Sequence, residues 1–305
     1  MIQFAGRRLV TLPLVLLGIS AAVFVCVRLV PGDPALVIAG LQASEAELVE
    51  IRAKLGLDKP FPAQFAIWLS QVVRGDLGVS LITNTPVLDL IKVRYVLTFQ
   101  IAAASTVLAT LLGVVSGVFA ASRRYSAIDG VITIVSLLGV SVPAFWLGVM
   151  LMLVFALYLN WLPAGGADSI LHLVLPTVAL GAYSWGIIAR MTRASMLEVL
   201  NQDYIRTAQA KGLAQHPVLF RHALKNATLP VITVIGIQFG TLLAGAVVTE
   251  SVFGLPGLGA LLVSSIFQRD FPVIQGAVLA IATSFVLINL FVDLTYAWVD
   301  PRIHY

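Results

Sequence analysis

The chain has 305 residues, of which 59% are apolar and only 11% are charged, whereas soluble domains average about 45–50% and about 25%. This composition excludes a soluble globular domain and an intrinsically disordered chain. The net charge of +4 is not concentrated in a dense basic run, which argues against nucleic-acid binding. The single cysteine, Cys26, excludes an internal disulfide framework. The sequence therefore predicts an all-α polytopic membrane protein.

Six apolar stretches are long enough to cross the ~30 Å core of a bilayer as helices. They are residues 9–27, 97–121, 130–159, 173–189, 227–249 and 271–292. Pro143 interrupts the third stretch, and Pro230 is expected to open the helix of the fifth. The first stretch lacks a small-residue cleavage pattern, so we interpret it as a retained helix and not as a signal peptide.

The distribution of Lys and Arg predicts the orientation of these helices. Six basic residues lie between the fourth and fifth stretches: Arg190, Arg193, Arg206, Lys211, Arg221 and Lys225. The short connections on the opposite side, residues 160–172 and 250–270, contain Arg269 as their only Lys or Arg. Both termini are therefore expected in the cytoplasm, and residues 31–93 are expected outside it.

The segment between the first and second stretches is expected to be ordered. Ser44 and Glu47 have the spacing of a capping box. Apolar residues at helical spacing follow it, and residues 61–73 form a second amphipathic pattern. The alternative is a loose extracytoplasmic loop.

Several kinds of active chemistry are missing from the sequence. No phosphate-binding loop of the form G-x-x-x-x-G-K-[ST] is present, so ATP hydrolysis is not expected from this chain. Ser141 lies within a span, but no histidine lies at membrane depth in another span to activate it. Glu250 is placed near a membrane interface, and an acidic or histidine relay at the bilayer midplane is missing. We therefore expect no cofactor or metal in this chain and an external source of energy.

The polar connection between the fourth and fifth stretches contains a distinct pattern. Asp203 can cap a helix over residues 204–211, and Gly212 can end that helix. Ala208, Ala210 and Gly212 would give the helix a low surface that another protein can approach closely. A second short helix is expected over residues 217–226.

This connection resembles the cytoplasmic loop of ATP-binding-cassette (ABC) importer permeases. Residues 204–213 read YIRTAQAKGL, which is similar to the dipeptide and oligopeptide branch. With Gly212 aligned, only Ala208 matches the Glu-Ala-Ala triplet of the wider family, and this departure is typical of the branch. Further similar stretches are LVPGDP at 29–34, GDLGVS at 75–80, and residues 250–259 and 293–305. Residues 38–40 and 166–169 look most like glutathione-type permeases.

The resemblance implies a type I ABC importer permease fold with six transmembrane helices. It divides the chain into a first transmembrane helix (1–30), an extracytoplasmic segment (31–93), a permease core of five transmembrane helices (94–295) and a cytoplasmic tail (296–305). Within the core, residues 190–228 would form the loop that couples to the ATPase. The coupling residues implied are Tyr204, Arg206, Thr207, Ala208, Ala210, Lys211 and Gly212.

The resemblance also implies partners. These are a second homologous permease subunit, two ATP-binding subunits that would hold ATP and magnesium, and an extracytoplasmic peptide-binding protein. The chain itself would sit in the lipid of a bacterial inner membrane and would bind no nucleic acid.

Polar side chains at membrane depth are candidates for a substrate path. Gln238 and Thr241 in the fifth stretch and Asn289 in the sixth fit this description. The alternative is that they form hydrogen bonds between helices. Gly113 and Gly117 form a G-x-x-x-G pattern, which favours close helix packing.

Alternative functions remain open at this point. A permease for glutathione or for a nickel chelate belongs to the same branch. A membrane scaffold subunit without a transport role belongs to another class. An ion channel would need a re-entrant filter or a ring of charges, and the sequence contains neither.

Overall fold

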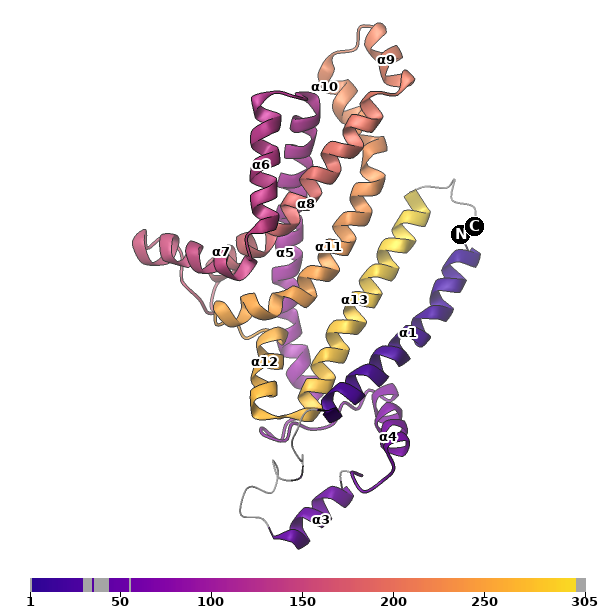
Figure 1. The fold of residues 1–305 in the computed structure, drawn as a ribbon, viewed down its shortest axis with the longest axis vertical. Coiled ribbons are helices and arrows are strands. Elements are labelled where there is room, and N and C mark those ends of the chain that lie inside the picture. The colour runs from indigo at the N-terminus through magenta and orange to yellow at the C-terminus, as the bar shows by residue number, and fades with distance from the viewer. Residues whose placement is uncertain (1, 30–34, 36–43, 55, 300–305) are drawn as a thin grey trace.

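The computed structural model describes residues 2–29, 35, 44–54 and 56–299. These residues form a bundle of long helices with smaller helices at both ends (Figure 1). One end of the bundle carries the short helix α9 (Asp203–Ala210), and the other end carries α3 (Glu45–Lys54), α4 (Phe61–Val73) and α12 (Leu258–Gln268). We call these the α9 end and the α12 end.

Five helices in the described residues are long and apolar enough to cross a membrane. They are α1 (Ile2–Leu29), α5 (Val87–Ser122), α8 (Val174–Leu200), the continuous helix formed by α10, η3 and α11, and α13 (Phe271–Val299). In the continuous helix, α10 spans Gln215–Pro217, η3 is a π-helical turn over Val218–Ala223, and α11 spans Leu224–Val252. α1 packs against α13 (Figure 1).

The helical elements are longer than the apolar stretches alone predict. α5 begins at Val87, ten residues before the predicted start at residue 97, and α8 continues to Leu200 past the predicted end at residue 189. Polar residues can extend a transmembrane helix beyond the bilayer because its backbone hydrogen bonds are internal. α13 ends at Val299, so the predicted tail is helical in its first four residues, and residues 300–305 lie outside the described part of the chain.

The third predicted span is not one straight helix. α6 (Ala127–Ser141) and the following α7 (Ala144–Leu151) with its π-helical extension η1 (Met152–Tyr158) are bent by 102° relative to each other. Val142 has an extended backbone, as expected before a proline, and Pro143 begins the new helix. The second arm projects sideways from the bundle (Figure 1). The third predicted span is therefore a pair of helices with a sharp bend between them.

Two other predictions about helix limits are wrong. The expected second short helix over residues 217–226 is not separate, because it continues without interruption into α11. Pro230 consequently lies inside the helix and does not open it. A proline at this position removes one backbone hydrogen bond, which a membrane helix tolerates when its neighbours compensate.

Close packing against α8 organises the centre of the bundle. A Cβ atom added to Gly113 would lie 2.7 Å from Cγ2 of Ile188, and one added to Gly117 would lie 2.6 Å from the carbonyl oxygen of Ala189. Both glycines therefore allow α5 to approach α8 closely, as the G-x-x-x-G pattern predicts.

The segment after α1 contains the two helices that the sequence predicts. Ser44 and Glu47 form the expected capping box, in which the Ser44 backbone N–H donates to the Glu47 carboxylate at 2.9 Å and the Glu47 N–H donates to Ser44 Oγ at 3.3 Å. The hydrogen bonds from the Ser44 backbone and hydroxyl hold the pKa of Glu47 below its usual value. A turn then brings Val79 opposite Pro86 before α5 begins.

Candidate functional site

The helix that matches the predicted coupling segment is α9, at one end of the bundle. It spans Asp203–Ala210, and Gln202 precedes it as the N-cap without a side-chain hydrogen bond. Asp203 is thus the first helical residue and not the cap that the sequence predicts. Gly212 ends the helix with a φ of 78°, and its N–H donates to the carbonyl of Gln209 at 2.9 Å. This left-handed backbone explains the need for glycine at the stop.

One face of α9 attaches it to the rest of the protein. Ile205 and Ala208 are buried in an apolar cluster with residues of α5, α8, η3 and α11. The other buried members are Val118, Ala121, Met196, Val218, Ala223 and Ala227. The hydroxyl of Tyr204 also accepts a hydrogen bond from Asn226 Nδ2 at 2.7 Å. α9 is therefore anchored to the ends of three long helices.

This anchoring corrects the predicted role of Ala208. The sequence places Ala208 on the low surface that a partner would approach, but only 9% of its surface is exposed and its side chain packs inward. The sequence motif indicates that a small residue is needed at position 208. In the structure, the space for this side chain is limited by its packing against α5, α8 and α11. The exposed coupling candidates are Tyr204, Arg206, Thr207, Ala210, Lys211 and Gly212.

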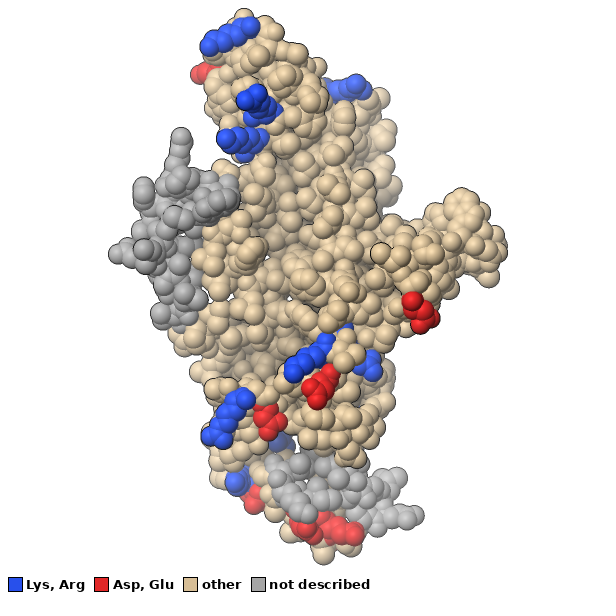
Figure 2. Space-filling view, turned by 180° about the vertical axis from the view of Figure 1, so that it is seen from behind, with Lys and Arg blue, Asp and Glu red and all other residues tan. Residues whose placement is uncertain are grey.

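Basic side chains surround the exposed face of α9. Figure 2 shows Lys and Arg gathered at the α9 end, whereas acidic and basic side chains are mixed toward the α12 end. Arg206 is 72% exposed and pairs with Asp203 across one helical turn at 3.6 Å, a surface contact that contributes little to stability. The α9 end thus presents a short, anchored helix within a basic surface.

A partly buried ion pair that the sequence did not predict braces this end. Arg193 of α8 donates from Nε to Asp129 of α6 at 2.6 Å, and a second bond from Nη2 measures 2.8 Å. Asp129 also accepts from the backbone of Tyr125 at 3.0 Å. Such two-bonded pairs fix relative orientation. Asp129 lies next to the predicted start of the third span. A charged residue at that position was the one feature of the sequence that could have indicated a polar partner.

The three substrate-path candidates have different surroundings. Gln238 is buried, and its Nε2 has no hydrogen-bond partner among the described residues. Thr241 is exposed, and its hydroxyl donates to the carbonyl of Ile237 in its own helix. Asn289 is partly buried in α13. The structure does not bring the three together through a hydrogen bond, so their role in a path stays a prediction.

Glu250, which the sequence places near a membrane interface, is fully buried within the protein. Its carboxylate accepts from the backbone N–H groups of Gly259 at 2.7 Å and Ala260 at 3.0 Å, and from the hydroxyl of Thr98 at 2.5 Å. The Thr98 hydroxyl oxygen in turn accepts from the N–H of Leu258. Glu250 thus holds the first turn of α12 against α11 and α5.

A second buried carboxylate at the α12 end also escaped the sequence analysis. Asp270 precedes α13 and accepts from Ser80 Oγ at 2.5 Å and from the backbone of Leu81 at 3.1 Å. This joins the turn before α5 to the turn before α13. Two carboxylates therefore fix the connections at the α12 end, and both serve the architecture.

Comparison with known proteins identifies the family to which the chain belongs. The family of "binding-protein-dependent transport system inner membrane component" proteins matches residues 113–305, and the family of their N-terminal parts matches residues 1–102. The chain belongs to this family of ABC importer permeases. It is a multi-pass membrane protein, as the composition predicts.

Similar permeases match over nearly their whole length. The dipeptide transport system permease protein DppB of Alkalihalophilus pseudofirmus is 43% identical, with 100% of both chains covered. A probable peptide ABC transporter permease of Sinorhizobium fredii is 46% identical, with 98% of both covered. The glutathione transport system permease protein GsiC of Pectobacterium atrosepticum is 44% identical, again with 100% of both covered. The predicted resemblance to the dipeptide and glutathione branch is confirmed.

Proposed function

We propose that this permease is the membrane subunit of an ATP-driven importer of di- or oligopeptides. Its full-length identity of 43% to a dipeptide permease and 46% to a probable peptide permease carries the proposal. It would lie in the inner membrane of a bacterium with both termini in the cytoplasm, because Lys and Arg predominate over acidic side chains at the α9 end, whereas the two signs are mixed toward the α12 end. Transport would also require partner subunits.

The proposed complex contains a second permease subunit, two ATP-binding subunits and an extracytoplasmic peptide-binding protein. ATP and magnesium would be bound by the ATP-binding subunits. The exposed face of α9, with Arg206, Ala210 and Lys211, would sit against an ATP-binding subunit. Movement of that subunit would shift α9, and the cluster around Ile205 would pass the shift to α5, α8 and α11.

Substrate uptake in the native host tests the proposal. Deleting the gene should abolish uptake of labelled dipeptides or longer peptides, and the wild-type gene should restore it. Glutathione and a nickel chelate are assayed in parallel, because a glutathione permease is equally similar at 44% identity. Loss of only glutathione or nickel uptake would transfer the assignment to that substrate. Unchanged uptake of every solute, with no ATP-binding subunit copurifying, would support the scaffold alternative.

A further inference from the structure

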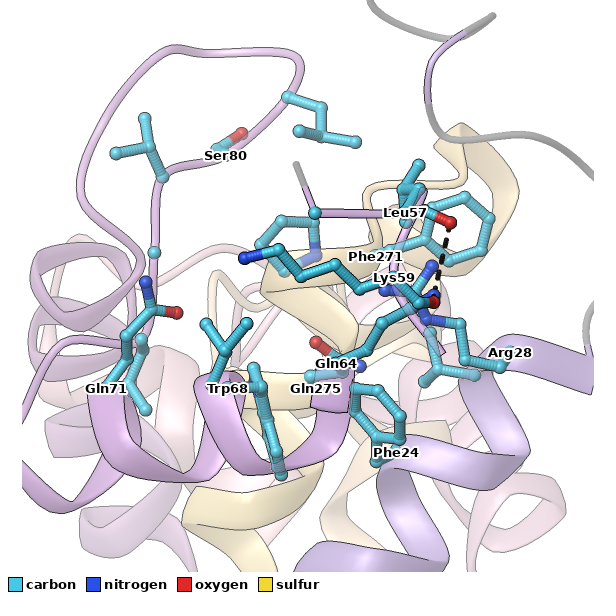
Figure 3. Close-up of a pocket in the computed structure, with 18 of the residues that line it drawn as sticks. Phe24, Arg28, Leu57, Lys59, Gln64, Trp68, Gln71, Ser80, Phe271 and Gln275 are labelled. Carbon is cyan, nitrogen blue, oxygen red and sulfur yellow. Dashed lines mark hydrogen bonds between the residues drawn. The ribbon is translucent and has the colours of Figure 1, made fainter. Parts of the chain in front are cut away.

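A cavity of about 570 Å³ lies where the end of α1 meets the segment that follows it (Figure 3). Four parts of the chain build it: α1, the α3–α4 region, the turn before α5, and the start of α13. Phe24, Trp68 and Phe271 supply aromatic surface. The cavity lies apart from α9 and from the three substrate-path candidates, so the function proposed above leaves it unexplained.

Two cationic side chains line this cavity, and the described residues of its lining provide no counter-charge. Arg28 comes from α1 and Lys59 from the connection before α4, and Figure 3 shows both beside Gln64. Arg28 lies over the ring of Phe24 at 5.3 Å. Neither cation forms an ion pair within the described part of the chain, and the described residues that line the cavity include no Asp or Glu. Unpaired cations that share a cavity favour an anionic ligand.

Two glutamines supply neutral groups that also lack partners. Gln64 donates from Nε2 to the carbonyls of Leu57 at 3.2 Å and Lys59 at 2.8 Å, but its Oε1 is buried and unbonded. Gln275 is 92% buried, since only 8% of its surface is exposed, and its amide makes no hydrogen bond to another described residue. A buried amide oxygen normally has a partner, so a ligand that donates to Gln64 Oε1 is expected, and the Gln275 amide can supply a further hydrogen bond.

The position of Arg28 decides which anion fits best. It is the penultimate residue of the apolar span Thr11–Leu29, so its side chain lies at the boundary between the bilayer core and water. The aromatic cluster of Phe24 with Phe61, Phe65 and Trp68 marks the same depth. Lipid headgroups lie at this depth, and Arg and Lys side chains form charge-assisted hydrogen bonds with phosphate oxygens.

We propose that this cavity binds the headgroup of a phospholipid, with Arg28 and Lys59 on the phosphate. Gln275 donates to a phosphate oxygen, and Gln64 Oε1 accepts from a hydroxyl of the headgroup. Phosphatidylglycerol offers each of these groups a partner, because its phosphate oxygens accept from both cations and from Gln275, and its glycerol hydroxyls donate to Gln64 Oε1. The bound lipid would join α1 to α4 and to the start of α13. The proposal is independent of which solute the permease carries.

Lipid binding to the purified permease, with any copurifying subunits, tests this assignment. Native mass spectrometry in detergent measures retention of added short-chain phosphatidylglycerol, with phosphatidylcholine as a headgroup that lacks hydroxyl donors. We expect tighter binding of phosphatidylglycerol, and about tenfold weaker binding in the double variant R28Q/K59Q. The matched control R74Q/K92Q removes two exposed charges outside the cavity and should bind like the wild type.

Further variants separate binding from folding. R28K/K59R preserves the charges and should retain binding, whereas Q275M preserves volume, removes an amide and should weaken binding severalfold. Thermal unfolding of each sample identifies variants that fail to fold. Equal retention of phosphatidylglycerol by wild type, R28Q/K59Q and Q275M would overturn the proposal. Displacement of the lipid by inorganic phosphate or a dipeptide at equal concentration would also overturn it, because the ligand would then be a soluble molecule and not a lipid.

Discussion

At the scale of single residues, the same amino-acid type has opposite roles on the two faces of α9. Ala208 is packed among the ends of α5, α8 and α11, whereas Ala210 is exposed two residues later. A helix turns by about 100° per residue, so the two side chains point to different surroundings. This contrast provides a matched pair of variants with distinct expected outcomes.

Replacing Ala210 with Trp should abolish copurification of the ATP-binding subunit and peptide uptake while the permease stays at normal abundance. The bulky ring would cover the exposed face of α9 without disturbing the apolar cluster beneath it. Replacing Ala208 with Trp should instead lower the abundance of the permease, because overpacking a buried site costs about 1–3 kcal/mol or more. Immunoblots and copurification from the same cells measure both. Normal uptake by the Ala210→Trp variant would remove α9 from the coupling interface.

Gly212→Val tests the helix stop at the end of α9. A β-branched residue is strained at a φ of 78°, and the cost is about 1–2 kcal/mol. No atom lies within 4 Å of a Cβ built on Gly212, so the effect arises from the backbone alone. We expect reduced uptake with near-normal abundance, whereas Gly212→Asn should retain more uptake because asparagine tolerates this conformation. Equal uptake by both variants would contradict a conformational role for Gly212.

Glu250→Leu should destabilise the permease by about 2–4 kcal/mol, because it leaves two buried backbone N–H groups without an acceptor. Glu250→Gln keeps one acceptor oxygen, so its loss should be about 1 kcal/mol. The thermal unfolding midpoint of the detergent-solubilised protein measures the difference. If the two variants unfolded at the same temperature as the wild type, Glu250 would not hold the start of α12.

At the scale of elements, α8 is the helix around which the others are arranged. It contacts α5, α6, α7 and α11, and glycines on α5, on α6 and on α8 itself permit close backbone approaches. Membrane helices gain little hydrophobic free energy from association, so close backbone packing carries more of the stability. The bend after α6 also depends on a single element boundary, because α6 ends at Ser141 and Pro143 immediately precedes α7.

Gly117→Ala should lower the unfolding temperature, because the new methyl group would lie 2.6 Å from the carbonyl oxygen of Ala189 and would push α5 away from α8. Overpacking of this kind costs about 1–3 kcal/mol. Gly245→Ala is the matched control in α11, where no atom lies within 4 Å of the added methyl group. It should be neutral or stabilising by about 0.5–1 kcal/mol. An equal response of the two variants would argue against close α5–α8 packing.

At the scale of the whole molecule, the two ends of the bundle differ in charge and in construction. The α9 end is basic and carries one anchored helix, and the α12 end is closed by carboxylates that hold turns together (Figure 2). By the positive-inside rule, the basic α9 end is expected to face the cytoplasm.

Thiol labelling in intact cells tests this orientation. In a background with Cys26 replaced by Ser, a cysteine at Gln215 should be shielded from an impermeant reagent, whereas one at Ser44 should react. Both positions are exposed in the structure, so accessibility to the reagent depends on the side of the membrane. Lysed cells provide the control in which both react. Labelling of residue 215 in intact cells would reverse the proposed topology.

The membrane class, the approximate spans, the capping box at Ser44, the glycine stop at Gly212 and the family could all be predicted from the amino-acid sequence. These features depend on local composition or on short spacings, which a linear sequence contains in full. The inward direction of Ala208, the burial of Glu250, the pairing of Asp129 with Arg193 and the cavity at Arg28 could not be predicted without the packed helices. Each of these depends on segments distant in the chain: Glu250 meets Thr98 across 152 residues and Asp129 meets Arg193 across 64. A polar residue near the end of an apolar stretch looks the same in sequence whether water or a buried partner satisfies it. Whether water or a protein group satisfies such a residue depends on its burial, which is a property of the packed helices.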